Sequence, residues 1–333
     1  MLRLAALAGT LAVVLAASTG IAATGFQKPS FGVVEKGEWA NTSGEKALIK
    51  SEVWINNPNP VSIPAIIDLS YSVESENITL ASGEIKDLGL EKGNNTVELK
   101  TKLNAEKIPA WWEKHVRQGE ESQLSVKVSF HIPFQSFERN IFNQEIETDF
   151  SKTVEEGFEP VEGSYTGPEF QIGPKIIDQS VRPEMEVKDV EVEFGNVSNS
   201  TTELFISFEA SNPNEFSIPA PRFTGSVDVD GLKMVEWNST PVNGVEEIPG
   251  GSSRTLKYSA AMNHGKLDEM ALNHVQSGGE SSVGLQAAMV FEFRGERFRL
   301  PEEGFDCEMT LSASMLEGGE KPGMRAESCK GLN

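Results

Sequence analysis

The stretch Asn57-Pro58-Asn59, followed after two residues by Ser62-Ile63-Pro64, decides how this chain is organised, because it occurs twice. The second copy is Asn212-Pro213-Asn214, followed by Ser217-Ile218-Pro219, with the same internal spacing and 155 residues further along. Proline fixes φ and withholds its N–H, while asparagine side chains hydrogen-bond nearby backbone and tolerate left-handed geometry. Each motif therefore predicts a strand end and a corner. The functional alternative is that the amides are exposed and bind sugar or lipid head groups.

The two copies extend well beyond the motif. Val97-Glu98-Leu99 matches Leu256-Lys257-Tyr258 with an offset of 159, so four residues have entered an intervening loop. His115-Val116 matches His274-Val275 with the same offset. A chain of 333 residues is long enough for about two domains of ordinary size. The sequence thus predicts two tandem copies of one module.

Apolar residues alternate with polar ones through both copies, which indicates strands with one wet face. The clearest rows are Ile67, Leu69, Tyr71 and Val73; Leu124, Val126, Val128, Phe130 and Ile132; and Leu285, Ala287, Met289, Phe291 and Phe293. Segments 108–116 and 267–275 instead have apolar residues at helical spacing, before Gly119 and Gly278. The pattern predicts an all-β fold of two tandem immunoglobulin-like or fibronectin III-like antiparallel β-sandwiches, each with one short α-helix.

The predicted boundaries follow from composition. They are an N-terminal apolar helix at 1–28, a first sandwich at 29–155, a linker and lead-in at 156–180, a second sandwich at 181–315 and a loose tail at 316–333.

The N-terminal segment is the only stretch apolar enough to cross a bilayer. Leu4 to Phe26 contains no charged residue and would reach about 34 Å as a helix. Arg3 before it and the acidic chain after it favour an inside N-terminus. We expect a cell-membrane protein with one span and extracellular domains. The alternative is a signal cleaved after Ala23 and a secreted protein.

The chain is strongly acidic. It has 50 Asp and Glu against 29 Lys and Arg, a net charge of −21 spread along the sequence. This charge repels nucleic acid and anionic lipid. A dispersed acidic surface also stays hydrated in concentrated salt, where charges are screened within about 3 Å at 1 M. The composition favours a halophilic source, with an ordinary acidic, soluble surface as the alternative.

Two further features suit an exported protein. Asn-x-Ser/Thr acceptors for N-glycosylation occur at Asn41, Asn77, Asn94, Asn196, Asn199 and Asn238. Cys307 and Cys329 are the only cysteines, so they form either one disulfide that pins the tail or two free thiols.

No pattern in the sequence predicts an enzyme, a metal site or a cofactor. There is no nucleophile elbow, no phosphate-binding glycine loop and no zinc-ligand spacing. His115 and His274 lie beside the apolar stripes of the predicted helices, where packing is their expected role. Trp111 and Trp112 point about 100° apart on a helix, and we expect them to pack in the core or at its edge. The alternative is that one faces outward and contacts lipid.

The order of an apolar strand, Asn-Pro-Asn, a proline-containing corner, an alternating strand and a later helix resembles a known family. It is similar to the water stress and hypersensitive response (WHy) domain, the group 2 late embryogenesis abundant fold. Both copies match, over most of residues 29 to 310. The glycine usual after the second strand is met at Gly83 but not clearly in the second copy.

The resemblance implies a fibronectin-like sandwich with a helix and a role in desiccation tolerance, without catalytic residues. Its signature transfers onto Asn57, Pro58, Asn59, Asn212, Pro213 and Asn214. We therefore expect a non-enzymatic cell-surface protein of desiccation or osmotic stress. The alternatives are a lipid-binding or lipid-transfer module at the membrane, and an envelope adhesion or scaffold protein. The expected partners are the membrane, through the N-terminal segment, and a lipid or envelope protein.

Overall fold

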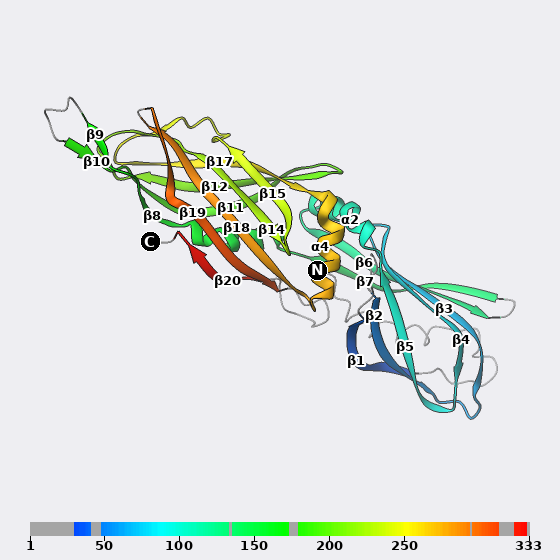
Figure 1. Cartoon of the computed structure of the whole chain (residues 1–333). Helices are drawn as coiled ribbons and strands as arrows, with labels where there is room; N and C mark the ends of the chain where they lie inside the picture. Colours follow the sequence, from blue (N-terminus) through cyan, green and yellow to red (C-terminus); the bar gives the residue numbers. More distant parts are fainter. Residues whose placement is uncertain are drawn as a thin grey trace. The chain divides into compact units, whose positions relative to one another are not determined.

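The structure is a computed structural model of the chain, and it describes residues 30–40, 48–132, 135–172, 179–293, 295–312 and 323–331. The predicted N-terminal helix at 1–28 lies outside these residues. Two compact units divide the chain between Thr148 and Asp149, and Ala271–Glu280 groups with the first unit. Each unit consists mainly of one curled antiparallel sheet (Figure 1).

The first unit has seven strands in the order β1-β2-β5-β4-β3-β6-β7. Its elements are β1 Ser30–Ala40, β2 Leu48–Asn57, β3 Ile63–Ser75, β4 Ile78–Leu90, β5 Gly93–Leu103, a 3-10 turn Ala105–Lys107, α2 Ile108–Arg117, β6 Glu121–Ile132 and β7 Gln135–Glu147. Within this sheet β4 and β5 pair only over a short ladder, Ala81–Gly83 with Thr101–Leu103.

The core of the first unit comes from the alternating rows. Leu69, Tyr71 and Val73 of β3 are at most 3% exposed, and Leu124, Val126 and Val128 of β6 are at most 1% exposed. Tyr71 lies opposite Gly83 across β3 and β4, and its hydroxyl is 2.5 Å from Thr101 Oγ1. A Cβ at Gly83 would lie 2.3 Å from that hydroxyl, so only glycine leaves room for the ring.

The second unit has nine strands in the order β20-β19-β18-β14-β15-β17-β12-β11-β8, plus the two-stranded pairs β9–β10 and β13–β16. Its elements are α3 Phe150–Phe158, a 3-10 turn Glu159–Val161, β8 Gly163–Thr166, β9 Phe170–Ile172, β10 Gln179–Val181, β11 Glu184–Val197, β12 Thr201–Asn212, β13 Ile218–Pro219, β14 Arg222–Val229, β15 Leu232–Ser239, β16 Glu247–Ile248, β17 Ser252–Asn263, a 3-10 turn His264–Lys266, β18 Glu280–Phe293, β19 Glu296–Ser312 and β20 Gly323–Lys330. The helix α4, Leu267–Gln276, comes between this 3-10 turn and β18, and its residues from Ala271 onward group with the first unit.

Aromatic rings fill the middle of the second unit. Phe208, Phe223 and Tyr258 are at most 1% exposed, and their ring centroids lie 5.3–5.7 Å apart. In the second unit the glycine that lies opposite an aromatic residue is Gly225 on β14, which pairs with Trp237 on β15. The sequence alone did not clearly identify this glycine. The first unit has its aromatic ring on the first strand of the hairpin and its glycine on the second, and the second unit has the reverse.

The four additional residues of the second copy lie in the loop between β15 and β16. This loop is fixed to β17, because Val242 N donates to Lys257 O at 2.7 Å and Asn243 Nδ2 donates to Thr255 O at 2.8 Å. The chain then returns to pair Ile248 with Ile218. In the first unit β4 runs directly to Leu90, which pairs with Ile63.

Several elements differ from the predicted boundaries. The predicted linker 156–180 contains β8, which pairs with β11 inside the sheet, and α3 begins before it at Phe150. The prediction of a loose tail beyond Leu316 is wrong for Gly323–Lys330, because this segment forms β20 and pairs with β19. The predicted helices are present as α2 and α4.

The described part of the chain is mostly β, with curled antiparallel sheets and a few short helices, as the sequence predicts at this level. No helix among the described residues is long and apolar enough to cross a membrane.

Candidate functional site

The first Asn-Pro-Asn motif ends β2 and builds the corner to β3. Asn57 is fully buried, and its Nδ2 donates to Val61 O at 3.1 Å and to Leu90 O at 3.3 Å. Its Oδ1 accepts from the backbone N–H and the side-chain amide of Asn59, at 3.1 and 2.8 Å. One carboxamide thereby joins the end of β2, the following loop and the end of β4.

The second motif has the same hydrogen bonds. Asn212 is 1% exposed, and its Nδ2 donates to Phe216 O and Ile248 O, both at 2.8 Å. Its Oδ1 accepts from the backbone N–H of Asn214 at 3.0 Å and from the Asn214 amide at 2.5 Å. These first asparagines face the interior, so their amides are used within the fold and do not offer a binding surface.

The second asparagine of this corner adds a link to another strand. Asn214 Nδ2 donates to Glu184 O at 2.7 Å, and Asn214 Oδ1 accepts from Glu184 N at 3.1 Å. Glu184 is the first residue of β11. The motif therefore holds together segments that are about 30 and 36 residues away in sequence.

A buried polar cluster lies under α2 in the first unit. His115 is fully buried, with Nδ1 2.8 Å from Ser122 Oγ and Nε2 2.6 Å from Thr148 Oγ1. Burial lowers the pKa of His115 to about 4, so the ring is neutral near pH 7. The Trp111 ring stacks on it with centroids 4.8 Å apart. A neutral, enclosed imidazole with two hydroxyl partners is a packing element, and it cannot reach a substrate.

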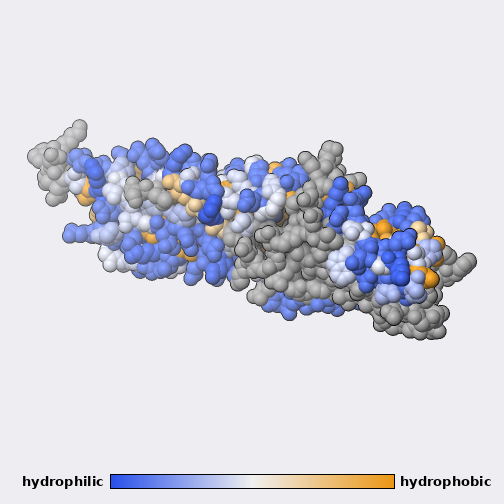
Figure 2. Space-filling view, turned by 90° about the horizontal axis from the view of Figure 1, so that it is seen from below, coloured by the Kyte–Doolittle hydropathy of each residue, from blue (hydrophilic) through white to orange (hydrophobic). Residues whose placement is uncertain are grey.

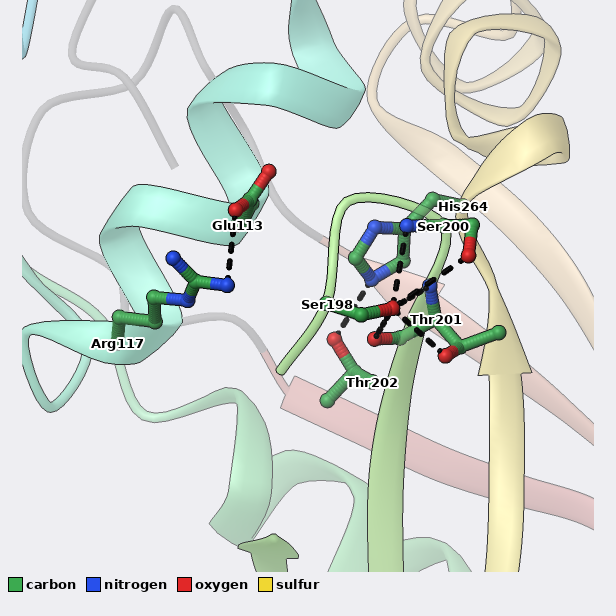
Figure 3. A network of polar contacts seen from close by, with 7 residues as sticks. All are labelled: Glu113, Arg117, Ser198, Ser200, Thr201, Thr202 and His264. Atoms are coloured by element: carbon green, nitrogen blue, oxygen red, sulfur yellow. Dashed lines mark hydrogen bonds and ion pairs between the residues drawn. The ribbon is translucent and has the colours of Figure 1, made fainter. Parts of the chain in front are cut away.

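The other histidines of this kind are also interior. His274 and Ser281, at the positions that match His115 and Ser122, are each 3% exposed. His264 is 1% exposed and its Nε2 lies 2.7 Å from Thr202 Oγ1 (Figure 3). Among the described residues no group of three or more His, Cys, Asp or Glu is placed to hold a metal ion.

The two adjacent tryptophans do not face solvent. Trp111 and Trp112 are 5% and 6% exposed, and Trp111 Nε1 donates to Ser75 Oγ at 3.1 Å. The structure therefore favours the expected packing role, and the alternative of a lipid contact is wrong for these two residues. Both rings belong to the core, because α2 lies against the sheet with Trp111, Trp112, His115 and Val116 inward. The charged pair Arg117–Glu113, at 3.0 Å, lies on the same helix (Figure 3).

The predicted modification sites have clear positions. Five acceptor asparagines are exposed: Asn77, Asn94, Asn196, Asn199 and Asn238. Asn41 lies outside the described residues. Ser198 and Thr201, the hydroxyl residues of two acceptor sequences, are hydrogen-bonded within the β11–β12 turn, with Ser198 Oγ accepting from Thr201 N at 2.9 Å (Figure 3).

The cysteines are joined. Cys307 and Cys329 lie directly opposite each other on β19 and β20 and form a disulfide. Cys307 is fully buried. The disulfide fixes β20 to the sheet. Of the two alternatives left open by the sequence, the structure has the disulfide and not the free thiols.

Sequence reasoning missed two open pockets in the second unit. One, of about 490 Å³, lies over β14, β15, β18 and β19 and includes Trp237, Glu236 and Gln286. The other, of about 740 Å³, is lined by Thr166, Glu169, Arg182, Arg297, Phe298 and Arg299, among others. Arg299 lines both pockets. Neither pocket contains a histidine or a cysteine.

The face in Figure 2 is hydrophilic over most of its described surface, and apolar residues form small separate spots on it. In the part of the chain that the structure describes, the large apolar side chains that are exposed are Val61, Ile66 and Val242, at 52%, 48% and 52%. Single exposed apolar residues of this kind are ordinary on a soluble surface.

Comparison with known families gives one match. Residues 52–145 match the family described as late embryogenesis abundant protein. The match supports that family. It covers β3 to β6 and most of β7 in the first unit, including the corner that Asn57 builds. No curated protein matches the chain.

Several solved structures are similar to the chain at low sequence identity. A protein from Archaeoglobus fulgidus is 18% identical, with a TM-score of 0.34, over 39% of this chain and 98% of that one. Red sea bream transglutaminase is 12% identical, with a TM-score of 0.18, over 77% of this chain and 29% of that one. An exo-chitosanase from Amycolatopsis orientalis is 9% identical, with a TM-score of 0.18, over 85% and 29%. These TM-scores are too low to support any inference about activity.

Proposed function

We propose that the chain is a non-enzymatic protein of desiccation or osmotic stress, built from two tandem WHy-type β-sandwich modules. The match of residues 52–145 to the late embryogenesis abundant family carries this proposal. The equivalence of the two modules is supported by their corners, since Asn57 and Asn212 have the same four hydrogen bonds. Acidic, hydrated surfaces on two rigid sheets fit a role in holding water at the cell envelope.

The proposal places the modules outside the cell, attached through the N-terminal segment or secreted after its cleavage. The exposed acceptor asparagines and the Cys307–Cys329 disulfide support an exterior location, because disulfides persist in oxidising compartments. The net charge of −21 fits a salt-adapted organism. A membrane lipid partner is no longer supported by the tryptophan pair, since Trp111 and Trp112 are buried.

The test is the survival of a deletion strain under drying and under shifts in salt concentration. We expect lower survival than the parent strain and recovery when the gene is restored. A restored copy with both Asn57→Asp and Asn212→Asp should fail, because each change disrupts one corner. A copy with Asn199→Ala, at an exposed position, should restore survival fully. Fractionation of tagged protein between membrane and medium, in the same strains, tests the predicted location. Equal survival of the deletion and parent strains would remove the stress role.

A further inference from the structure

The 740 Å³ pocket of the second unit is lined by several positively charged residues, although the chain as a whole is acidic. Three of the ten arginines of the chain, Arg182, Arg297 and Arg299, line it. Arg297 and Arg299 are two residues apart on β19, so they project from the same side of the strand. Like charges placed side by side repel, and an anion bound between them would relieve this repulsion.

The pocket also contains two carboxylates, Glu169 and Glu302, one fewer than its arginines. Among the described residues, neither Arg297 nor Arg299 has an acidic partner within 4.0 Å, although the chain contains 50 carboxylates. Arg182 has a single contact with Glu169 at 3.4 Å, and their side chains are 64% and 48% exposed. Exposed ion pairs with a single contact are weak in water, so an incoming anion can compete with Glu169 for the guanidinium.

The walls that carry these arginines are held in place by packing. Phe298, between Arg297 and Arg299, stacks on Phe291 and packs on Phe170, with centroids 5.2 Å apart in each case. Gly167 N donates to Pro183 O at 2.7 Å, next to Arg182. A Cβ at Gly167 would lie 3.1 Å from the Phe298 ring. The β8–β9 segment therefore lies close against β19, and both sides of the pocket have fixed backbones.

We propose that this pocket binds a small polyanion, whose carboxylate or phosphate groups are held by the guanidinium groups of Arg182, Arg297 and Arg299. A guanidinium presents a planar fork of N–H donors that matches the two oxygens of a carboxylate or phosphate. The pocket volume is within the range of small-ligand sites, about 300–1,000 Å³. Three arginines favour a ligand with at least two anionic groups over a monovalent anion. The inference is independent of the stress role.

The test is isothermal titration of the full chain, at low ionic strength, with citrate and with inorganic pyrophosphate. The two probes distinguish a carboxylate ligand from a phosphate ligand. We expect saturable binding of at least one probe. Acetate at the same concentration should give no saturable heat. The double change Arg297→Gln and Arg299→Gln should weaken binding by about tenfold or more, because it removes two charge-assisted hydrogen-bond donors from the anion.

Arg254→Gln is the matched control, because Arg254 lies on β17 of the same unit, outside the pocket, and donates to the carbonyl of its neighbour Ser253. This variant should bind within about twofold of the parent chain, the limit expected for a distant surface charge. Equal weakening in both variants would show general charge attraction and overturn the proposal. Absence of saturable binding by both probes would also overturn it. If the double variant loses its native circular dichroism, Arg182→Gln tests the same requirement from the other wall.

Discussion

The buried carboxamide of Asn212 gives the sharpest test of how the corner is held. Asn212→Ala removes both donated hydrogen bonds and leaves the carbonyls of Phe216 and Ile248 and the N–H of Asn214 without this partner. A buried polar group without a partner costs about 1–3 kcal/mol. Since water can reach part of the loop, we take the lower end for each group and expect a decrease of about 3 kcal/mol in the free energy of unfolding.

Asn212→Asp tests the donated hydrogen bonds alone, because it removes them without changing the size of the side chain. Aspartate has nearly the same shape and still accepts from Asn214, but it places a second oxygen 2.8 Å from each of the two carbonyls. An ionised carboxylate has no proton to donate there. The aspartate variant should therefore be destabilised at pH 7 at least as much as the alanine variant.

Urea unfolding followed by circular dichroism measures the destabilisation, and hydrogen exchange locates it at β12, β16 and the start of β11. Asn199→Ala is the control, because Asn199 is exposed in the same unit; its effect should stay within about 0.5 kcal/mol. The reasoning is refuted if Asn212→Asp costs less than about 1 kcal/mol, since the donated bonds would then be dispensable.

The remaining predictions concern the buried histidine and the disulfide. The pKa of His115 is about 4 in the folded chain against an ordinary 6.5, so its contribution to stability is complete above pH 6.5 and falls by about 2–3 kcal/mol as the pH drops to 4.5. Denaturant unfolding followed by tryptophan fluorescence should show this decrease in the parent chain and in the control His131→Gln, at an exposed site, but not in His115→Gln. Parallel pH profiles for all three proteins would contradict it. Replacing Cys307 and Cys329 by alanine opens a loop of 22 residues and should cost about 3 kcal/mol. The destabilisation should appear as faster hydrogen exchange across β20, and unchanged exchange there would count against a role for the disulfide in fixing this strand.

The parts of the fold that the sequence predicted are those with a local signal. Alternation identified the buried rows of β3, β6 and β18, because successive side chains of a strand point to opposite faces. Helical spacing identified α2 and α4, each followed by a glycine with positive φ, Gly119 and Gly278. The corners were predicted because proline and asparagine act on their own backbone.

The missed features depend on partners that are distant in sequence. β8 looked like a linker because it is four residues long, and it is a strand only through its pairing with β11. β20 is polar and follows a glycine-rich stretch, so its pairing with β19 and the disulfide had no periodic signal. The helical spacing puts Trp111 and Trp112 at the edges of the apolar stripe and leaves core and edge packing open, and the surrounding sheet buries both.

The basic pocket shows where composition could have been more informative. In a chain with 50 acidic residues another carboxylate says little, whereas positive charges placed close together are unusual. Arg294, Arg297 and Arg299 occur within six residues, which was a visible signal of a basic strand. It could not by itself indicate a pocket, because an isolated strand of arginines is also an ordinary solvated edge. The pocket requires Arg182, which lies 115 residues earlier and reaches this wall only because Thr166 and Glu184 pair in the β8–β11 ladder. The cluster of arginines on β19 therefore supports a hypothesis about binding only because the fold places Arg182 on the other side of the same pocket.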